Sequence, residues 1–327
     1  MLEPLISIII PVLNGASFLE RCFLTLDMQT YANLEVIFID NGSSDSSREI
    51  ISNHCKQYEN HFLLDCTIPG PGAARNQGVK FAKGEYISFL DVDDELKPDK
   101  HHILIEGFQS YPQAAMVVGN TSKIYSDGRE VMLDLGSLNV GLNKPPKPGL
   151  LWLQQFQHHP HINSMLIKKQ SIVHVNGIPE NMFMGCVNGE DIALSVKIGM
   201  ESEIILINKL VCIYHRHNES SVTKANQVFS LTERYFQFYE KFALPYFFAK
   251  QDTEPFKKAF YFCDNISFTM LMKLIKDEKR SFYINILKVL QDKCYISQSL
   301  FKKVLYSILP YKIANYLHHK FYRYAQL

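Results

Sequence analysis

The chain has 327 residues, of which 46% are hydrophobic and 20% charged, and its formal net charge is +1 at pH 7. This composition excludes an intrinsically disordered, collagen-like or coiled-coil protein, and the near-zero charge argues against a general nucleic-acid binder. A chain of this length can bury a large core and favours two domains over one.

The N-terminal part of the chain alternates short apolar runs with amphipathic stretches, which is typical of βαβ units around a mainly parallel sheet. The predicted strands are Ile6–Pro11, Glu35–Ile39, Phe62–Leu64, Tyr86–Leu90 and Met116–Gly119. The predicted crossover helices are Ala16–Asp27, Asp45–Tyr58, Ala73–Ala82 and Pro98–Ser110. The sequence therefore predicts a Rossmann-like α/β fold.

The first apolar run, from Leu5 to Val12, also bears on cellular location. It follows Glu3, where a secretory signal would carry Lys or Arg, so we interpret it as a buried strand. The seven cysteines are odd in number and include no C-x-x-C pair, so we expect them to be reduced thiols. No window reaches the roughly 18 apolar residues that span a bilayer. We expect a cytoplasmic protein whose membrane contact, if any, is peripheral.

The alternating pattern ends after Gly119. Asp127 and Gly128 predict a tight hairpin turn, and Asn143–Gly149, which holds three prolines, predicts a loop. A helical pattern and two apolar runs follow, at Ile192–Gly199, Ile204–Ile207 and Val211–Tyr214.

The C-terminal third differs from the rest in charge. From Ser221 to Leu327 it carries 17 Lys and Arg against 8 Asp and Glu, with Phe and Tyr at helical spacing. This asymmetry indicates two parts with different partners. We predict one domain over residues 1–223 and a basic, aromatic, helical region over 224–327, with helix breaks at Pro245 and Pro310.

Acidic side chains follow two of the predicted strands. Asp40 ends the second strand, at the sheet edge where ligands bind in open α/β folds, and could contact a base or ribose. The alternative is that Asp40 closes a turn and Asp45 caps a helix.

The fourth strand is followed by Asp91, Asp93, Asp94 and Glu95. So much negative charge is costly unless a cation compensates it, and carboxylates suit Mg²⁺ or Mn²⁺. This pattern predicts a site for a metal and a diphosphate, with a solvated acidic turn as the alternative.

Two predicted helices begin with groups that could serve chemistry. A Gly- and Pro-rich approach leads into the helix that carries Arg75, and a helix start favours anions. Glu190 and Asp191 open a later helix, where they could complement its dipole or, for Asp191, accept a proton from a sugar hydroxyl.

Together these segments, from Ser7 to about Thr223, resemble the inverting GT-A glycosyltransferases of family 2. The residues that carry the resemblance are Ile10–Asn14, Ile39–Asp45, Gly72–Asn76, Leu90–Asp94 and Gly189–Asp191. The resemblance implies a Rossmann-like GT-A fold for this part of the chain, and the predicted helical region over 224–327 is then a C-terminal extension outside the resemblance. It also implies that Pro11, Asn14 and Asp40 line the nucleotide pocket and that Arg75 lies against the nucleotide.

The same resemblance assigns the metal and the base. Asp91 and Asp93 match the D-x-D motif, with Asp93 as the more direct ligand of Mn²⁺ or Mg²⁺ and Asp91 as a ribose or sugar contact that could also bind the metal. Asp191 matches the catalytic base, with Glu190 placed to contact acceptor or donor sugar. His217 would touch the diphosphate or complete the metal shell.

The implied activity is transfer of a sugar, with inversion, from a nucleotide-sugar donor to a glycan or lipid-linked saccharide. A UDP-sugar is favoured as donor, and cell-surface polysaccharide, such as lipopolysaccharide or capsule, as the pathway. The competing interpretations are a nucleotidyltransferase, although its glycine-rich basic loop after the first strand is absent, and a non-catalytic nucleotide-sugar-binding partner of an assembly complex.

Two features stand apart from the family pattern. Asp40 is followed by Asn41 where many members have a second aspartate, which leaves the geometry of the base pocket open. His158, His159 and His161 match no motif, and for them we favour acceptor contact over a metal site.

The aromatic and basic stretch 301–323 could lie at the inner face of the cell membrane as an amphipathic helix. The alternative is that it packs against the catalytic core.

Overall fold

The computed structural model describes residues 3–180, 189–217 and 231–276. The chain divides into two compact units, Met1–Lys224 and Ala225–Leu327. Pro310, the stretch 301–323 and the expected boundary at 223/224 lie outside the described residues.

The first unit begins with regular alternation of strands and helices, as the sequence predicts. Its elements up to the sixth strand are β1 (Ile6–Val12), α1 (Leu19–Asp27), β2 (Leu34–Asp40), α2 (Ser47–Cys55), β3 (His61–Asp65), α3 (Pro71–Phe81), β4 (Tyr86–Phe89), β5 (Glu95–Leu96), α4 (Lys100–Ser110) and β6 (Met116–Tyr125).

The remainder of this unit is less regular. Its elements are β7 (Glu130–Met132), β8 (Gly141–Asn143), α5 (Lys147–Gln154), the 3₁₀ turns η1 (Phe156–His158) and η2 (Ile162–Ser164), β9 (Met165–Lys168), α6 (Lys169–His174), α7 (Glu190–Glu201) and β10 (Ile204–Arg216).

One sheet runs through the unit in the order β3-β2-β1-β4-β9-β6-β10-β5. The pairs β1–β2, β2–β3, β1–β4 and β6–β10 are parallel. Strand β9 is antiparallel to both β4 and β6, so β6 and β10 run in the same direction as β4. The prediction of a mainly parallel α/β sheet is confirmed. Its consequence is that the carboxyl ends of these long strands share one edge.

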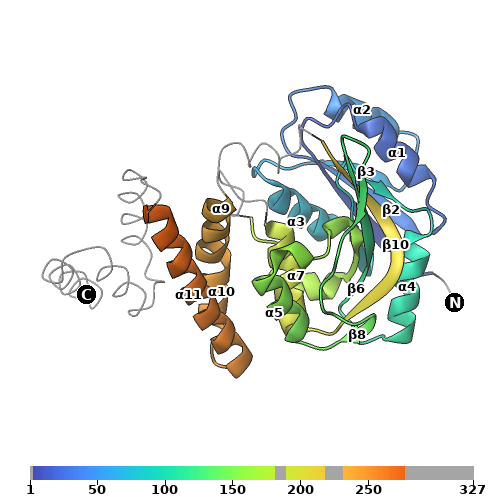
Figure 1. Cartoon of the computed structure of the whole chain (residues 1–327). Helices are drawn as coiled ribbons and strands as arrows, with labels where there is room; N and C mark the ends of the chain where they lie inside the picture. The colour runs from blue at the N-terminus through green and yellow to red at the C-terminus, as the bar shows by residue number, and fades with distance from the viewer. Residues whose placement is uncertain (1–2, 181–188, 218–230, 277–327) are drawn as a thin grey trace, which may run out of the picture. The chain divides into compact units, whose positions relative to one another are not determined.

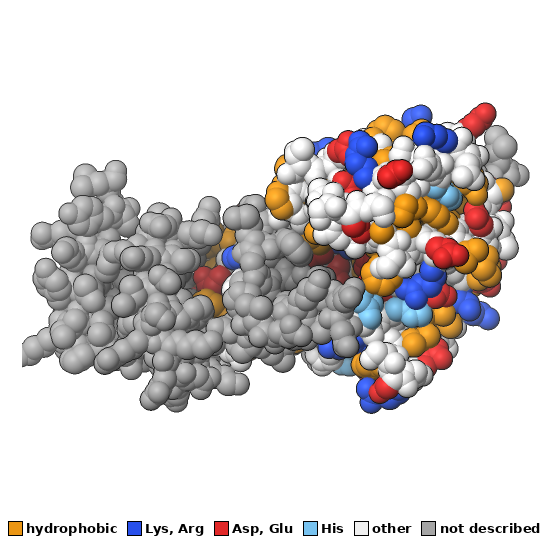
Figure 2. Space-filling view, turned by 90° about the horizontal axis from the view of Figure 1, so that it is seen from above, with side chains coloured by type: hydrophobic (Ala, Val, Ile, Leu, Met, Phe, Trp, Pro, Cys, Tyr) orange, Lys and Arg blue, Asp and Glu red, His pale blue; other side chains and the backbone are white. Residues whose placement is uncertain are grey.

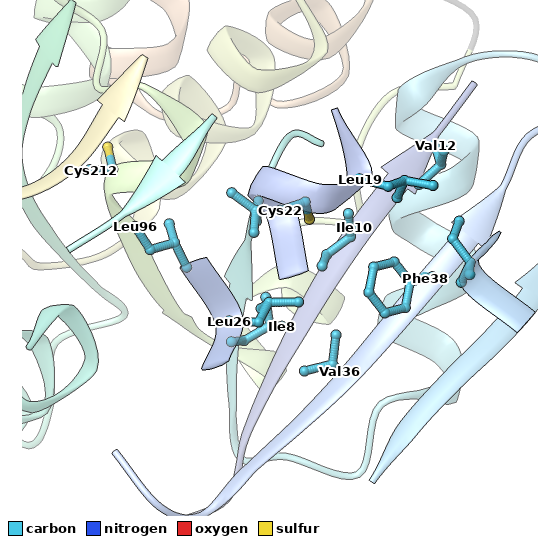
Figure 3. Close-up of a cluster of buried hydrophobic side chains, with 12 residues drawn as sticks. Ile8, Ile10, Val12, Leu19, Cys22, Leu26, Val36, Phe38, Leu96 and Cys212 are labelled. Atoms are coloured by element: carbon cyan, nitrogen blue, oxygen red, sulfur yellow. The ribbon is translucent and has the colours of Figure 1, made fainter. Parts of the chain in front are cut away.

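Helices cover both faces of the sheet (Figure 1). On one face, α1 packs against β1 and β2 in a cluster of buried apolar side chains (Figure 3). On the other, α3 approaches so closely that a Cβ at Gly78 would lie 2.4 Å from Ile9. Each fully buried aliphatic or aromatic side chain contributes about 1.5–3 kcal/mol. The residues labelled in Figure 3 are Ile8, Ile10, Val12, Leu19, Cys22, Leu26, Val36, Phe38, Leu96 and Cys212.

The predicted hairpin is present, because β6 and β7 pair across a turn in which Gly128 has a φ of +81°. The predicted loop at 143–149 is wrong at both ends. Its first residue belongs to β8 and its last three to α5. Proline is tolerated in the first turn of a helix, and Gly149 lets α5 pack closely on α7, since a Cβ there would lie 2.5 Å from the Met200 nitrogen.

The two apolar runs Ile204–Ile207 and Val211–Tyr214 both belong to one strand, β10. Irregular pairing with β6 between Leu206 and Cys212 accommodates the polar residues between the runs. A bulge of this kind bends a strand without ending it.

The described part of the second unit is helical, as predicted: α9 (Leu231–Phe238), the π-helical turn η4 (Tyr239–Ala243), α10 (Leu244–Ala249) and α11 (Glu254–Lys276). The predicted helix break at Pro245 is wrong. Proline cannot donate the usual hydrogen bond, and the π turn just before it lets the helical path continue.

Among the described helices, none is both long and apolar enough to cross a bilayer. Five cysteines of the described residues are free thiols: Cys22, Cys55, Cys66, Cys212 and Cys263.

A pair of histidines joins α2 to β3. The Nε2 atom of His54 lies 3.0 Å from Nδ1 of His61, and the ring of Phe23 stacks on His54 at 3.7 Å. Burial lowers the pKa of both imidazoles, that of His61 to about 4, against the opposite influence of Asp27. Both rings are therefore neutral at pH 7.

Because of this histidine pair, we expect the folded protein to lose stability in mild acid. The folded-state pKa values lie below the unfolded value of about 6.5, so the stabilisation is complete above that pH and is lost as pH falls toward 4. The free energy of unfolding in urea should fall between pH 7 and pH 5, and less steeply in His61→Gln. An identical slope in the variant would contradict the account.

Candidate active site

The site lies at the shared carboxyl edge of the sheet. Strand β1 ends at Val12, which pairs in register with Asp40 at the end of β2. Strand β4 ends at Phe89, two residues before Asp91. The predicted nucleotide and acidic segments therefore follow strands that are neighbours in the sheet.

The loops after β1 and β2 bind to each other. Asn14, with a φ of +52°, accepts a hydrogen bond from the Ser44 nitrogen at 2.8 Å and donates its own backbone N–H to Ser43 Oγ at 3.0 Å. Asp40 is 5% exposed and accepts the Ser43 N–H at 3.3 Å. Pro11 lies one residue before Val12 on β1. Three of the predicted nucleotide residues thus lie at two interlocked loops.

Asp45 has a structural part in the same loops. It accepts hydrogen bonds from the backbone N–H groups of Ser47 at 3.0 Å and Ala16 at 3.1 Å. Burial alone would raise the pKa of this carboxyl, but these bonds lower it. Asp40 therefore closes a turn, as the alternative interpretation of the sequence expected. The expected cap at Asp45 is displaced by one residue, because the N-cap position of α2 is Ser46, although Asp45 accepts the N–H of Ser47, the first residue of that helix.

The hydrogen bonds of Asn41, the residue after Asp40, require an amide at this position. Its Nδ2 donates to the carbonyls of Cys66 at 3.0 Å and Ile68 at 2.8 Å, and its Oδ1 accepts the Gly70 N–H at 2.7 Å. A carboxylate cannot donate to the two carbonyls. The amide thus holds the loop that leads into α3.

Arg75 joins the loop after β4 to the start of α7. It donates from Nη1 to Glu190 at 2.9 Å and from Nη2 to Asp91 at 2.6 Å. Its side chain is 5% exposed. Burial alone would lower the pKa of the guanidinium, but the two carboxylates raise it, so it stays charged. Burial also raises the pKa of Glu190.

Asp191 is held by an imidazole. Its Oδ2 lies 3.3 Å from Nε2 of His159, whose Nδ1 lies 2.6 Å from the carbonyl oxygen of Phe156. Both partners of the ring are acceptors, so the ring satisfies both when doubly protonated. Burial opposes that charge, but Asp191 raises the pKa of His159. In return His159 holds the pKa of the Asp191 carboxyl well below its usual range.

Asp93 and His217 also meet. The Nε2 atom of His217 lies 2.7 Å from Oδ2 of Asp93, and both side chains are about one quarter exposed. The guanidinium of Arg21 donates to the Asp93 carbonyl. This is one carboxylate and imidazole pair that could contribute ligands to a divalent cation.

A second grouping lies beside it. Ligand atoms of Asp91, Asp94 and His161 fall within 4.8 Å of one another. Asp94 is fully buried, which raises its pKa well above the usual value, with Asp93 and Asp91 adding to the effect. Its oxygens accept from the His215 N–H at 2.8 Å and from Asn163 Nδ2 at 2.7 Å. The chemistry of both groupings fits Mg²⁺ or Mn²⁺, which prefer oxygen ligands.

Sequence reasoning missed the place of the histidines and of Asn163. Because β9 runs antiparallel to its neighbours, its amino end lies at their carboxyl edge, and the segment before it enters the site. His159 reaches Asp191 and His161 lies 3.8 Å from Asp94, whereas His158 pairs with Asp134. The available signal was a polar, histidine-rich run directly before a short apolar one.

Comparison with protein families gives one match for this region. Residues 7–172, about half of the chain, match the family model described as Glycosyl transferase family 2. The matched range runs from the second residue of β1 through β9, and so includes the loops after β1 and β2 and the acidic loop after β4.

Among curated relatives, an uncharacterized glycosyltransferase of Haemophilus influenzae is 40% identical over 170 residues, which are 52% of this chain and 64% of the relative. A poly(ribitol-phosphate) β-glucosyltransferase of Bacillus spizizenii is 44% identical over 93 residues, which are 27% of this chain and 15% of that protein. The chain thus spans less than two thirds of the length of these relatives.

Among solved structures, residues 1–349 of S. aureus TarS in complex with UDP-GlcNAc align with a TM-score of 0.65 at 15% identity, covering 91% of this chain and 83% of that one. The mannosyltransferase PcManGT of Pyrobaculum calidifontis, in complex with GDP-Man and Mn²⁺, aligns with a TM-score of 0.54 at 16% identity, covering 90% and 82%. Likeness at this level of identity shows a shared fold.

Because Arg75 bridges two carboxylates, we expect its replacement to destabilise the protein strongly. Arg75→Met leaves two carboxylates without their cation, which should lower the free energy of unfolding by about 3–5 kcal/mol. Urea denaturation followed by circular dichroism measures it.

The matched control is Arg48→Met, because Arg48 also makes two bonds to a carboxylate, Asp65, but on the exposed surface. Solvent screens such a pair, so a small change is expected. Equal losses in the two variants would show that Arg75 does not hold the site together.

Proposed function

This chain belongs to glycosyltransferase family 2, and we propose that it transfers a sugar from a UDP-sugar to a glycan or lipid-linked saccharide with inversion. The observation that carries the proposal is the Arg75 bridge, which joins the D-x-D loop to the helix start that bears Asp191. The S. aureus TarS complexes with UDP-GlcNAc and UDP support the choice of UDP.

The nucleotide is proposed to bind over the loops after β1 and β2. Asp40, at the end of β2, would accept hydrogen bonds from uracil or ribose, and Pro11 and Asn14 would line the same pocket. Arg75 would act on the nucleotide indirectly, because its Nη2 atom holds the carboxylate of Asp91 in place. Asp91 itself is proposed to contact ribose or sugar.

Asp93 and His217 are proposed to hold Mn²⁺ or Mg²⁺, with Asp91 as a further ligand. The Mn²⁺ in the PcManGT complex and the acidic grouping at this edge support a divalent cation. When bound, such an ion supplies positive charge that stabilises the diphosphate leaving group.

Asp191 is proposed as the general base. It accepts the proton of an acceptor hydroxyl as that oxygen attacks the anomeric carbon from the side opposite the diphosphate, so that configuration inverts. His159 keeps the carboxylate ionised and fixes its direction. Glu190, which Arg75 holds in place, would contact the acceptor or donor sugar.

The proposed setting is cell-surface polysaccharide synthesis on the cytoplasmic side, with peripheral contact at the inner face of the membrane. The Bacillus spizizenii relative, which glucosylates poly(ribitol phosphate), supports a surface-polymer acceptor.

Replacing the base tests the mechanism. Asp191→Asn keeps the shape of the side chain but cannot accept the proton, so turnover should fall by about 10²–10⁴-fold. Turnover is measured as UDP released from a panel of UDP-sugars, without and with saccharide acceptors, and UDP affinity by calorimetry should stay unchanged.

The matched control is Asp99→Asn at the exposed position before α4, which should retain full turnover. Wild-type turnover in Asp191→Asn would contradict the base assignment. Release of no sugar by the wild-type protein under any condition would favour a non-catalytic binding partner, and release of diphosphate from nucleoside triphosphates would favour a nucleotidyltransferase.

A further inference from the structure

A basic and aromatic surface lies at the same sheet edge, beyond the acidic centre. Its members come from the carboxyl ends of β6 and β10 and from the turn between β6 and β7. We call it the basic–aromatic cluster, and it consists of Lys123, Tyr125, Arg129, Tyr214 and Arg216.

The strands bring these side chains onto one face. In the parallel β6–β10 pair, Lys123 lies opposite Tyr214 and Tyr125 opposite Arg216. Residues two apart on a strand point to the same side, so all four side chains share a face. Lys123 Nζ lies 4.8 Å from the ring centroid of Tyr125 and 5.4 Å from that of Tyr214. Arg129 lies 4.3 Å from the Tyr125 ring.

The cations of this cluster make no ion pair with a carboxylate of the described residues. Within the described ranges, no Asp or Glu oxygen lies within ion-pair distance of Lys123, Arg129 or Arg216. The two nearest acids in sequence make hydrogen bonds to other groups than these side-chain cations: Asp127 in the turn accepts the backbone N–H of Arg129 at 3.0 Å, and Glu130 at the start of β7 accepts a hydrogen bond from Ser122. The aromatic faces hold Lys123 and Arg129 while leaving their charge available to an anion.

The position of the cluster separates it from the nucleotide. Along the sheet, β3, β2 and β1 lie on one side of β4, and β9, β6 and β10 on the other. The ring of Tyr214 stacks on His161 at 4.6 Å, and His161 in turn approaches Asp94. The edge therefore runs from the nucleotide loops through the acidic centre to the cluster. In Figure 2, histidine side chains lie near Lys, Arg and acidic side chains on one face of the first unit.

We propose that the basic–aromatic cluster binds the acceptor, and that this acceptor is a saccharide chain bearing phosphate groups. The inference rests on the proposed transferase function and names its acceptor class. An anionic acceptor would be repelled by Asp91, Asp93 and Asp191 unless cations beside them offset that charge. The three cations of the cluster can bind a phosphate group that carries one or two negative charges. Its two tyrosine rings offer flat apolar faces against which sugar rings can pack.

The test uses native gel electrophoresis of the full chain through phosphorylated dextran, carboxymethyl dextran and neutral dextran of matched length. The wild-type protein should be retarded by phosphorylated dextran, less by carboxymethyl dextran and not by neutral dextran. In Lys123→Gln/Arg129→Gln, the dissociation constant for phosphorylated dextran should rise at least tenfold.

The matched control is Lys144→Gln/Lys209→Gln, which removes the same charge from two exposed positions elsewhere and should bind like the wild type. Three results would overturn the proposal: no retardation of the wild type by phosphorylated dextran, equal retardation by carboxymethyl dextran, or an equal loss in the control.

UDP titration of all three proteins separates this inference from the proposed function. The cluster variant should bind UDP as the wild type does, and a loss of UDP binding in this variant alone would place the cluster in the donor site instead. Absence of UDP binding and of donor turnover in the wild type would contradict the transferase proposal itself, whatever the dextran gels show.

Discussion

The candidate site depends on one buried guanidinium. Arg75 lies at the start of α3, and its two amino groups bind Asp91 after β4 and Glu190 at the start of α7, segments 99 positions apart in the chain. Removing this cation leaves the buried Glu190 and the partly buried Asp91 without their partner, which is more costly than breaking a surface pair. This bridge holds the acidic loop and the start of the helix that carries Asp191 together, so the groups proposed to serve the donor and the acceptor are positioned by one side chain.

The same region balances an excess of negative charge. Burial raises the pKa values of Asp94 and Glu190, whereas His159 lowers that of Asp191. Arg75 binds Asp91 and Glu190, and His159 binds Asp191. A divalent ion held by Asp93 and His217 would offset the negative charge that remains. Ionisation is thereby divided among neighbouring carboxylates according to burial and partner, which is how adjacent acids take different roles in one site.

Much of this could be predicted from the sequence, for local reasons. The βαβ rhythm up to β6, the hairpin at Gly128 and the acidic loop after β4 depend on short-range patterns. The position of His159, His161 and Asn163 in the site could not be predicted in this way. It follows from the antiparallel pairing of β9 with β4 and β6, which no local pattern specifies. The helix at Lys147 and the unbroken path through Pro245 were missed for a related reason, since tertiary packing and a π turn overrode the usual meaning of proline.

The most direct test of the account is calorimetric titration of UDP, GDP and CDP into the protein, with and without Mn²⁺, alongside Asp93→Ala. The account predicts that UDP binds in a metal-dependent way and that the variant loses most of the metal-dependent part, because the D-x-D loop supplies the ligand. Binding of no nucleotide under either condition, or metal-dependent UDP binding that is unchanged in Asp93→Ala, would contradict the assignment of this sheet edge as a metal-assisted donor site.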